Sequence, residues 1–125
     1  MTRYIPFLTL AISLFSHTAW TYGGGGGSDA CEEPGFFEVH PTGVISSLAE
    51  FGFVASGVTD ADSLRVEIGN QKIKPSVTKR RNGDWEAKAV LPEPLTQSGK
   101  VRVAITAQSR DGCSGFQAHF LEIKP

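Results

Sequence analysis

The stretch from residue 82 to residue 92 constrains the fold more than any other part of the chain. Its Asn82-Gly83 pair is a strong signal for a β-hairpin, because both residues tolerate the positive φ angles of a tight hairpin turn. The apolar positions that follow are spaced two apart, at Trp85, Ala87, Ala89 and Leu91. A period of two is typical of a half-buried strand. We expect Trp85 at the centre of the core, with a surface platform for a ligand as the alternative.

The N-terminus has the pattern of an export signal. Arg3 precedes an apolar run over residues 5–15, which is too short to span a bilayer but has the length of a signal-peptide core. We expect residues 1–22 to be a signal peptide, cleaved between residues 19 and 23. An uncleaved anchor over residues 4–22 is the alternative. The predicted location is therefore the periplasm or the cell exterior, without stable membrane insertion once the leader is cleaved.

The rest of the chain predicts a linker and one domain. Residues 23–30 form a flexible, glycine-rich linker, and residues 31–125 suffice for a single core. The GxGxxG pattern in the linker indicates no nucleotide site, because no strand precedes it and no helix follows. The net charge is −1, so we expect no nucleic-acid partner.

The chain has 2 cysteines, Cys31 and Cys113. An even number in an exported chain predicts one disulfide. Two free thiols in a reducing compartment are the alternative. Without matched histidines the two cysteines do not make a zinc site, and we predict neither a metal nor a cofactor.

Seven short segments have the composition of strands, and turn signals separate them. Pro75 lacks an N–H group, so the fourth segment should be an edge or bulged strand. In the last segment the apolar parity changes between Phe120 and Leu121, which predicts a bulge or burial on both faces. The segments are residues 36–40, 48–56, 63–68, 72–78, 83–91, 100–107 and 116–124.

This pattern predicts an all-β fold, a seven-stranded sandwich of two sheets with immunoglobulin-like topology. An open barrel is the alternative. Besides Trp85, the expected core residues are Phe51, Phe53, Val66, Val103 and Ile105.

Three short motifs resemble the bacterial extracellular immunoglobulin-like and fibronectin type III-like domains. They are Gly83-Asp84-Trp85, the strand opening at residues 99–103, and Asp111-Gly112 before the last strand. The resemblance covers residues 36–124 and implies a fold rather than a function. In many such domains the first and last strands lie side by side, which would let Cys31 meet Cys113. That disulfide departs from the usual bacterial form.

Strand alternation places three loops at the end that would carry the disulfide, residues 58–63, 79–84 and 109–114. Sandwich domains usually present binding surfaces on such loop clusters. The adjacent cations of the second loop would favour an anionic partner. The alternative is a solvated edge hairpin whose charges only prevent pairing with the sheet edge of another molecule. The aspartates are too few to complete a calcium site. The candidate binding residues are Asp60, Asp62, Lys79, Arg80, Arg81 and Arg110.

The sequence gives little support for a metal site at the histidines or for a catalytic site. His40 and His119 are expected on outer strand faces, and a shared metal would need them adjacent and joined by further ligands. Residues 76–79 match S-x-x-K, but that motif needs a helical turn, and a strand is predicted there. No nucleophile with a matched base is recognisable, so we predict that the protein is not an enzyme.

The sequence therefore predicts an exported, non-catalytic module that binds a protein or glycan partner through its loop end. The alternative is an accessory subunit of an envelope complex, which docks through the exposed sheet edge at residues 72–78. A carrier of small ligands or metals lacks the ligand residues.

Overall fold

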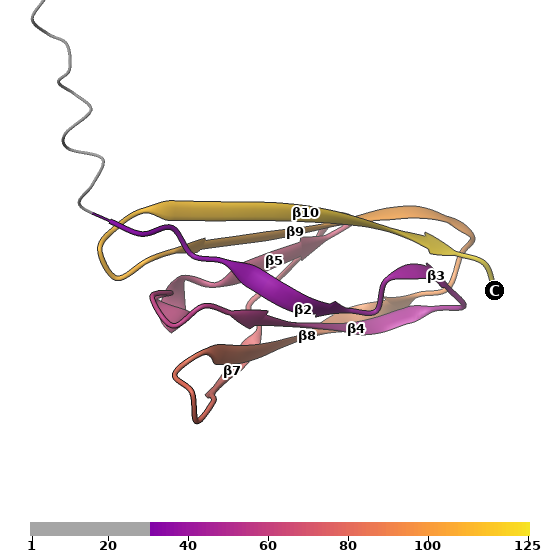
Figure 1. Ribbon diagram of the computed structural model, residues 1–125. Coiled ribbons are helices and arrows are strands. Elements are labelled where there is room, and N and C mark those ends of the chain that lie inside the picture. The colour runs from indigo at the N-terminus through magenta and orange to yellow at the C-terminus, as the bar shows by residue number, and fades with distance from the viewer. Residues whose placement is uncertain (1–30) are drawn as a thin grey trace, which may run out of the picture. The chain divides into compact units, whose positions relative to one another are not determined.

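Two β-sheets face each other in the computed structural model, which describes residues 31–125 (Figure 1). The predicted signal peptide and linker lie outside the described residues. The prediction of an all-β, two-sheet sandwich is confirmed. Seven strands were predicted, whereas the described region has one sheet of four strands and one of five. Within residues 31–125, no helical segment combines the length and the hydrophobicity of a membrane span.

The first sheet has the strand order β2-β4-β8-β7, and the second has the order β3-β10-β9-β5-β6. All neighbours are antiparallel except β3 and β10, which run parallel. A short 3-10 helix, η3, spans Ala61–Ser63. The strands are β2 Phe36–His40, β3 Gly43–Ile45, β4 Leu48–Ala55, β5 Arg65–Ile68, β6 Gln71–Ile73, β7 Ser76–Lys79, β8 Trp85–Leu95, β9 Gly99–Gln108 and β10 Ser114–Ile123.

The core lies between the sheets and takes its side chains from alternate positions of the strands. Phe51 and Phe53 of β4 meet the branched residues of the opposite sheet, and both rings are buried. Of the predicted core residues, Val66, Val103 and Ile105 are also buried. Period-two alternation accounts for these positions, because it puts every second side chain on the inward face.

The prediction that Trp85 lies at the centre of the core is wrong. Trp85 lies at the rim of the core. It is only partly buried and packs against the core cluster. The reason is its place in β8, where it is the first residue and adjoins the loops. The central inward positions of β8 are Ala87 and Ala89, which lie next to Phe53 and Phe51 in the ladder. The two phenylalanine rings fill the space beside these alanines.

Residues 72–78 form two strands in different sheets rather than one strand. β6 pairs with β5, whereas β7 pairs with β8. Buried Pro75 stands at the crossing between them. Because proline has no N–H to donate, it cannot continue a ladder, and the chain changes sheet at this residue. Both strands are at sheet edges, as the proline predicts.

β3 was not predicted from the sequence. After β2 the chain leaves the first sheet, and β3 joins the second sheet beside β10, with Leu121 opposite Gly43. The Lys124 amide donates to the Ile45 carbonyl at 2.8 Å, which extends this pairing. Three residues are too few to show a period of two. The N-terminal segment thus supplies an edge strand to each sheet.

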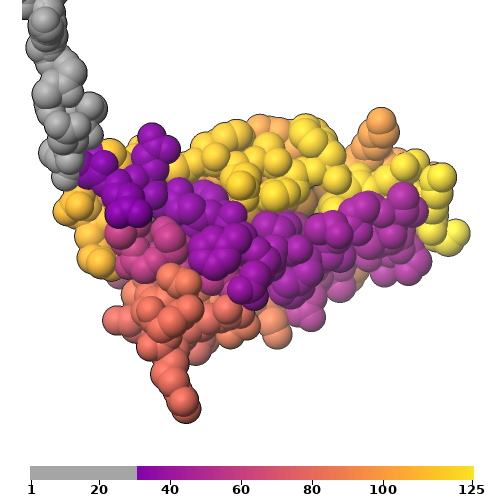
Figure 2. All heavy atoms as spheres, viewed as in Figure 1, coloured from indigo at the N-terminus to yellow at the C-terminus, as the bar shows by residue number. Residues whose placement is uncertain are grey.

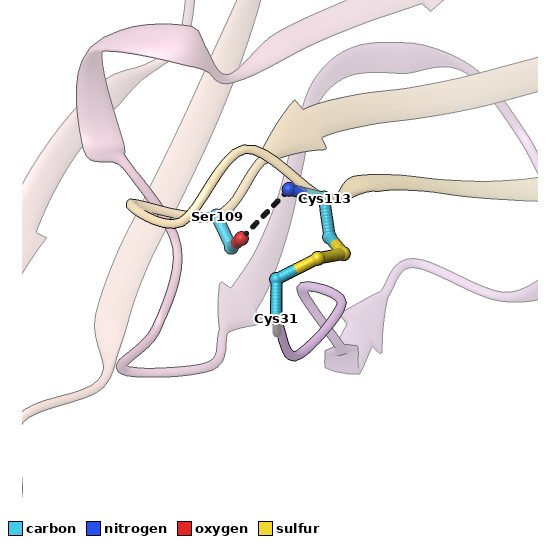
Figure 3. The surroundings of a disulfide bond; sticks show 3 residues. All are labelled: Cys31, Ser109 and Cys113. Carbon is cyan, nitrogen blue, oxygen red and sulfur yellow. Dashed lines mark hydrogen bonds between the residues drawn. A yellow bond between two sulfur atoms is a disulfide. The ribbon is translucent and has the colours of Figure 1, made fainter. Parts of the chain in front are cut away.

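The predicted disulfide joins Cys31 and Cys113, whose Cα atoms lie 5.8 Å apart (Figure 3). The bond ties the segment before β2 to the turn before β10, and so connects the two sheets at one end. The Cys113 amide donates to the Ser109 hydroxyl at 3.0 Å. Nearby, Pro34 packs so closely on Gly115 that a Cβ there would lie 2.9 Å from the Pro34 carbonyl oxygen. The strand beside β10 is β3, not the first strand β2 as the resemblance implied.

Candidate functional site

The three loops that were predicted to carry a binding surface lie at the disulfide end of the sandwich, at the left of Figure 1. We call residues 58–63, 79–84 and 109–114 the loop end. The Asp60 amide donates to the Gln108 carbonyl at 2.8 Å, which ties the first loop to the end of β9. The second loop approaches at Gly57, where a Cβ would lie 3.1 Å from the Gly83 carbonyl oxygen. The β7–β8 hairpin projects from the body (Figure 2).

Arg80 is held by carboxylates of the same protein. Its guanidinium lies 3.2 Å from Glu38 and 3.4 Å from Glu86. The hydrogen bond to Glu38, with help from Glu86, raises the pKa of Arg80. Glu38 has a φ of 52°, in the irregular part of β2 where its pairing with β4 shifts register. The charge of Arg80 is therefore largely neutralised within the fold.

The other two cations of the hairpin have no carboxylate partner within residues 31–125. The Lys79 ammonium lies over the Trp85 ring, 5.4 Å from its centroid, in a cation–π arrangement. Arg81 is exposed at the hairpin tip. These two residues therefore supply the unpaired positive charge that the hairpin presents at its surface.

The remaining predicted residues have local structural roles. An Asp60 carboxylate oxygen accepts from the Asp62 amide at 3.1 Å and caps η3. The Arg110 guanidinium donates to the Gly57 carbonyl at 2.7 Å. The Asp62 carbonyl accepts from Lys74 at 3.3 Å. These bonds fix the loop backbones and hold the side chains of Asp60, Lys74 and Arg110 in place.

A pocket of about 490 Å³ opens between η3 and the edge of the first sheet. Two carboxylates, Asp60 and Asp62, and two cations, Lys74 and Arg110, line it together with the Trp85 ring. The indole Nε1 of Trp85 is buried and has no hydrogen-bond partner among the described residues. An unpaired buried donor costs about 1–3 kcal/mol, so an acceptor that reached it would be favoured.

The structure thus brings three predicted residues, Asp60, Asp62 and Arg110, to one pocket. Lys79, Arg80 and Arg81 lie outside the lining. The Lys79 ammonium is nevertheless close to the pocket, because it lies over the Trp85 ring. Trp85 is part of the pocket lining, and its alternative role as a platform for a ligand stays a prediction. Lys74 was missed, because it lies beside Pro75 in what reads as an ordinary edge strand.

The two histidines have unrelated environments. His40 is exposed on the outer face of the first sheet, as predicted, and its ring covers Gly52. His119 was predicted on an outer face, but it points inward from β10, with its ring centroid 6.3 Å from that of Phe51. His119 shares the parity of the buried Leu121, and its Nε2 lies 2.9 Å from the Gln117 amide oxygen. Residues 31–125 contain no group of three histidine, cysteine or acidic side chains placed to hold a metal ion.

Comparisons with known proteins identify similar folds only. No protein-family model and no curated protein sequence matches the chain. Among solved structures, CopC from Methylosinus trichosporium OB3b aligns with a TM-score of 0.52 and 12% identity, over 73% of this chain and 95% of that one. PcoC, a methionine-rich copper resistance protein from Escherichia coli, aligns with a TM-score of 0.51 and 14% identity, over 74% of this chain and 100% of that one. At these identities the likeness shows a shared β-sandwich fold.

Proposed function

We propose that this protein is an exported, non-catalytic module that binds a protein or glycan partner in the periplasm or at the cell surface. The export signal predicted from the sequence and the disulfide support this compartment, because structural disulfides persist in oxidising environments. The S-x-x-K match supplies no catalytic pair. Ser76 donates to the Lys88 carbonyl at 3.3 Å, and Lys79 lies over Trp85.

The observation that carries the proposal is the loop-end pocket. An aromatic ring and two charges of each sign line one concave site. Pockets that combine an aromatic anchor with a few fixed polar groups are typical of binding sites. Because both signs of charge are present, the pocket suits a group that carries donors as well as acceptors, such as a polar side chain or a sugar.

Two exposed cations of the β7–β8 hairpin lie beside this pocket. Since Arg80 is paired internally, Lys79 and Arg81 are the hairpin cations that can attract a partner. Exposed charges of this kind raise association rates, and salt screens them. We therefore expect binding to weaken as ionic strength rises.

The test is affinity capture from envelope and secreted material with the exported protein, at low and at moderate salt. The loop-end variant carries Asp62→Asn, Lys79→Gln and Arg81→Gln. The matched control carries Lys88→Gln and Lys124→Gln, which also remove two exposed cations. We expect a partner that the native protein and the control retain and that the loop-end variant loses. A partner that all three proteins capture equally would contradict a loop-end site.

Docking along residues 72–78 receives less support. A peptide that adds a strand needs one continuous edge, and this stretch is divided between two sheets. β6 offers 3 residues and β7 offers 4, on either side of Pro75. An edge-docked partner would survive the loop-end substitutions, so the same experiment distinguishes the two modes.

Copper binding is not proposed, although PcoC is described as a copper resistance protein. Methionine and cysteine sulfur suit Cu(I), and imidazole suits Cu(II). This chain has 1 methionine, at residue 1, and both cysteines are in the disulfide. The histidines of the described region lie on different faces and are not part of a ligand cluster. The described residues therefore do not fit a copper site.

A further inference from the structure

We propose that the outer face of the five-stranded sheet is a second binding surface, and that its ligand is an anionic polysaccharide. We call this surface the sheet face. It shares only Lys74 with the loop-end pocket, so either proposal stands if the other fails. Its defining residues are Arg65, Lys72, Lys74, Arg102, Phe116 and Phe120.

Two phenylalanine rings stand exposed on β10. Phe116 is 60% exposed and Phe120 is 66% exposed. The change of apolar parity in this strand predicted a bulge or burial on both faces, and that prediction is wrong. The pairing of β10 with β9 is unbroken from Ser114 to Ile123, so both rings lie on the same outward face. The two residues are four positions apart along the strand, which corresponds to about 13 Å. A single exposed apolar residue is common on protein surfaces, so the case for a contact surface rests on the groups that surround the two rings.

Arg102 lies between these rings. It is the ladder partner of Phe120, and its guanidinium carbon is 5.7 Å from the centroid of Phe116. A guanidinium over an aromatic ring is attracted to the ring face and still carries donors that can point outward. The strip therefore alternates aromatic and cationic groups along the direction of β10.

Three more cations stand across the sheet from the rings. Arg65 and Lys74 both donate to the Asp62 carbonyl, at 2.9 and 3.3 Å, so their charge is oriented but not cancelled. Lys72 is exposed on β6. None of the cations of the sheet face forms an ion pair with a carboxylate within residues 31–125. The only carboxylate in the lining is that of Glu67. The hollow therefore carries a net positive charge.

The middle of the sheet face is hollow. Small residues of β9, Ala104 and Thr106, lie between the cations of β5 and β6 and the rings of β10. The resulting trough has a volume of about 670 Å³. An extended, narrow chain could lie in it with cations on one side and Phe116 on the other.

The chemistry of the trough favours a sugar polymer over a protein. The C–H groups of a pyranose ring carry slight positive charge and lie well against the electron-rich face of an aromatic ring. Carboxylate groups along the polymer would meet the guanidinium and ammonium groups. Protein interfaces, in contrast, are depleted of lysine at their centres, and here Lys72 and Lys74 line the hollow.

The test measures binding of the exported protein to polygalacturonate by titration calorimetry at low salt. Neutral dextran and poly-L-glutamate serve as comparators, because the first offers sugar rings without charge and the second offers charge without sugar rings. We expect polygalacturonate to bind more tightly than either. Phe116→Ala and Arg102→Gln should each weaken it by about tenfold, as expected for losing one charged or stacking contact. Arg102→Lys should fall between, since it keeps the charge and loses the planar group.

Matched control variants are Val90→Ala and Lys88→Gln on the outer face of the other sheet, and neither should change the affinity. Thermal melts check that every variant folds. Poly-L-glutamate binding as tightly as polygalacturonate would overturn the assignment to a polysaccharide. So would the absence of polygalacturonate binding, or self-association of the protein that Phe116→Ala abolishes. In that last case the sheet face would be an interface between two copies.

Discussion

Replacing both disulfide cysteines should destabilise the domain by about 2–4 kcal/mol. The bond spans a sequence separation of 82 residues. For a closed loop of that length, the chain-entropy relation gives about 4.5 kcal/mol at 25 °C. Measured losses are usually smaller, because the unfolded chain without the bond retains some structure. For a domain of this size, such a loss corresponds to a decrease in Tm of about 10–25 °C.

The contacts around the bond indicate which part of the domain loosens first. Without the covalent link, the entry to β2 is held by the packing of Pro34 on Gly115 and by two hydrogen bonds between Gly35 and Ser56. These contacts are few, so we expect early hydrogen exchange in the segment before β2. The sheets themselves should persist, because their ladders do not depend on the bond.

The assay is urea unfolding of the native protein and of the Cys31→Ser/Cys113→Ser variant, each with and without reductant. The reduced native protein should match the variant, and reductant should not affect the variant. A native protein whose unfolding midpoint is the same in both conditions would refute the stabilising role of the bond.

Three further predictions concern the core, the packing near the disulfide and metals. Phe51→Ala should lower the free energy of unfolding in urea by about 3–5 kcal/mol. Trp85→Ala should lower it by only about 1–2.5 kcal/mol, because the indole is partly buried and its removal also eliminates an unpaired N–H. Equal losses would contradict the rim position of Trp85. Gly115→Ala should destabilise by about 1–3 kcal/mol in the same assay, since its Cβ would press on Pro34, and an unchanged midpoint would contradict this close packing. Titration with Cu²⁺ should change neither the Tm nor the visible absorption, and stoichiometric binding would show a donor set that the described residues do not reveal.

Local alternation was enough to predict the central strands. In β4, β5 and β9 the inward positions carry large apolar residues and the strands are long enough for the period to show. The sequence pattern therefore found Phe53, Val66 and Ile105 in the core. The loop end followed from the same reasoning, since alternating strand direction gathers every second loop at one end.

Sheet membership could not be predicted in this way, because it depends on partners distant in sequence. Nothing in residues 72–78 indicates that Pro75 marks a crossing between sheets. The three residues of β3 acquire their structure only from β10. The partial burial of His119 depends on Phe51 of the opposite sheet, because the two ring centroids lie 6.3 Å apart.

The position of the N-terminal segment bears on whether two copies of this protein could exchange strands. Because β2 covers β4 and β3 covers β10, peeling away residues 31–45 would open one edge in each sheet at once. The same segment from a neighbouring molecule would fit both openings, which is the geometry of strand exchange and of polymers that grow by it. The disulfide anchors the start of this segment to its own molecule. It should therefore favour the closed monomer over exchanged forms, in addition to raising the free energy of unfolding.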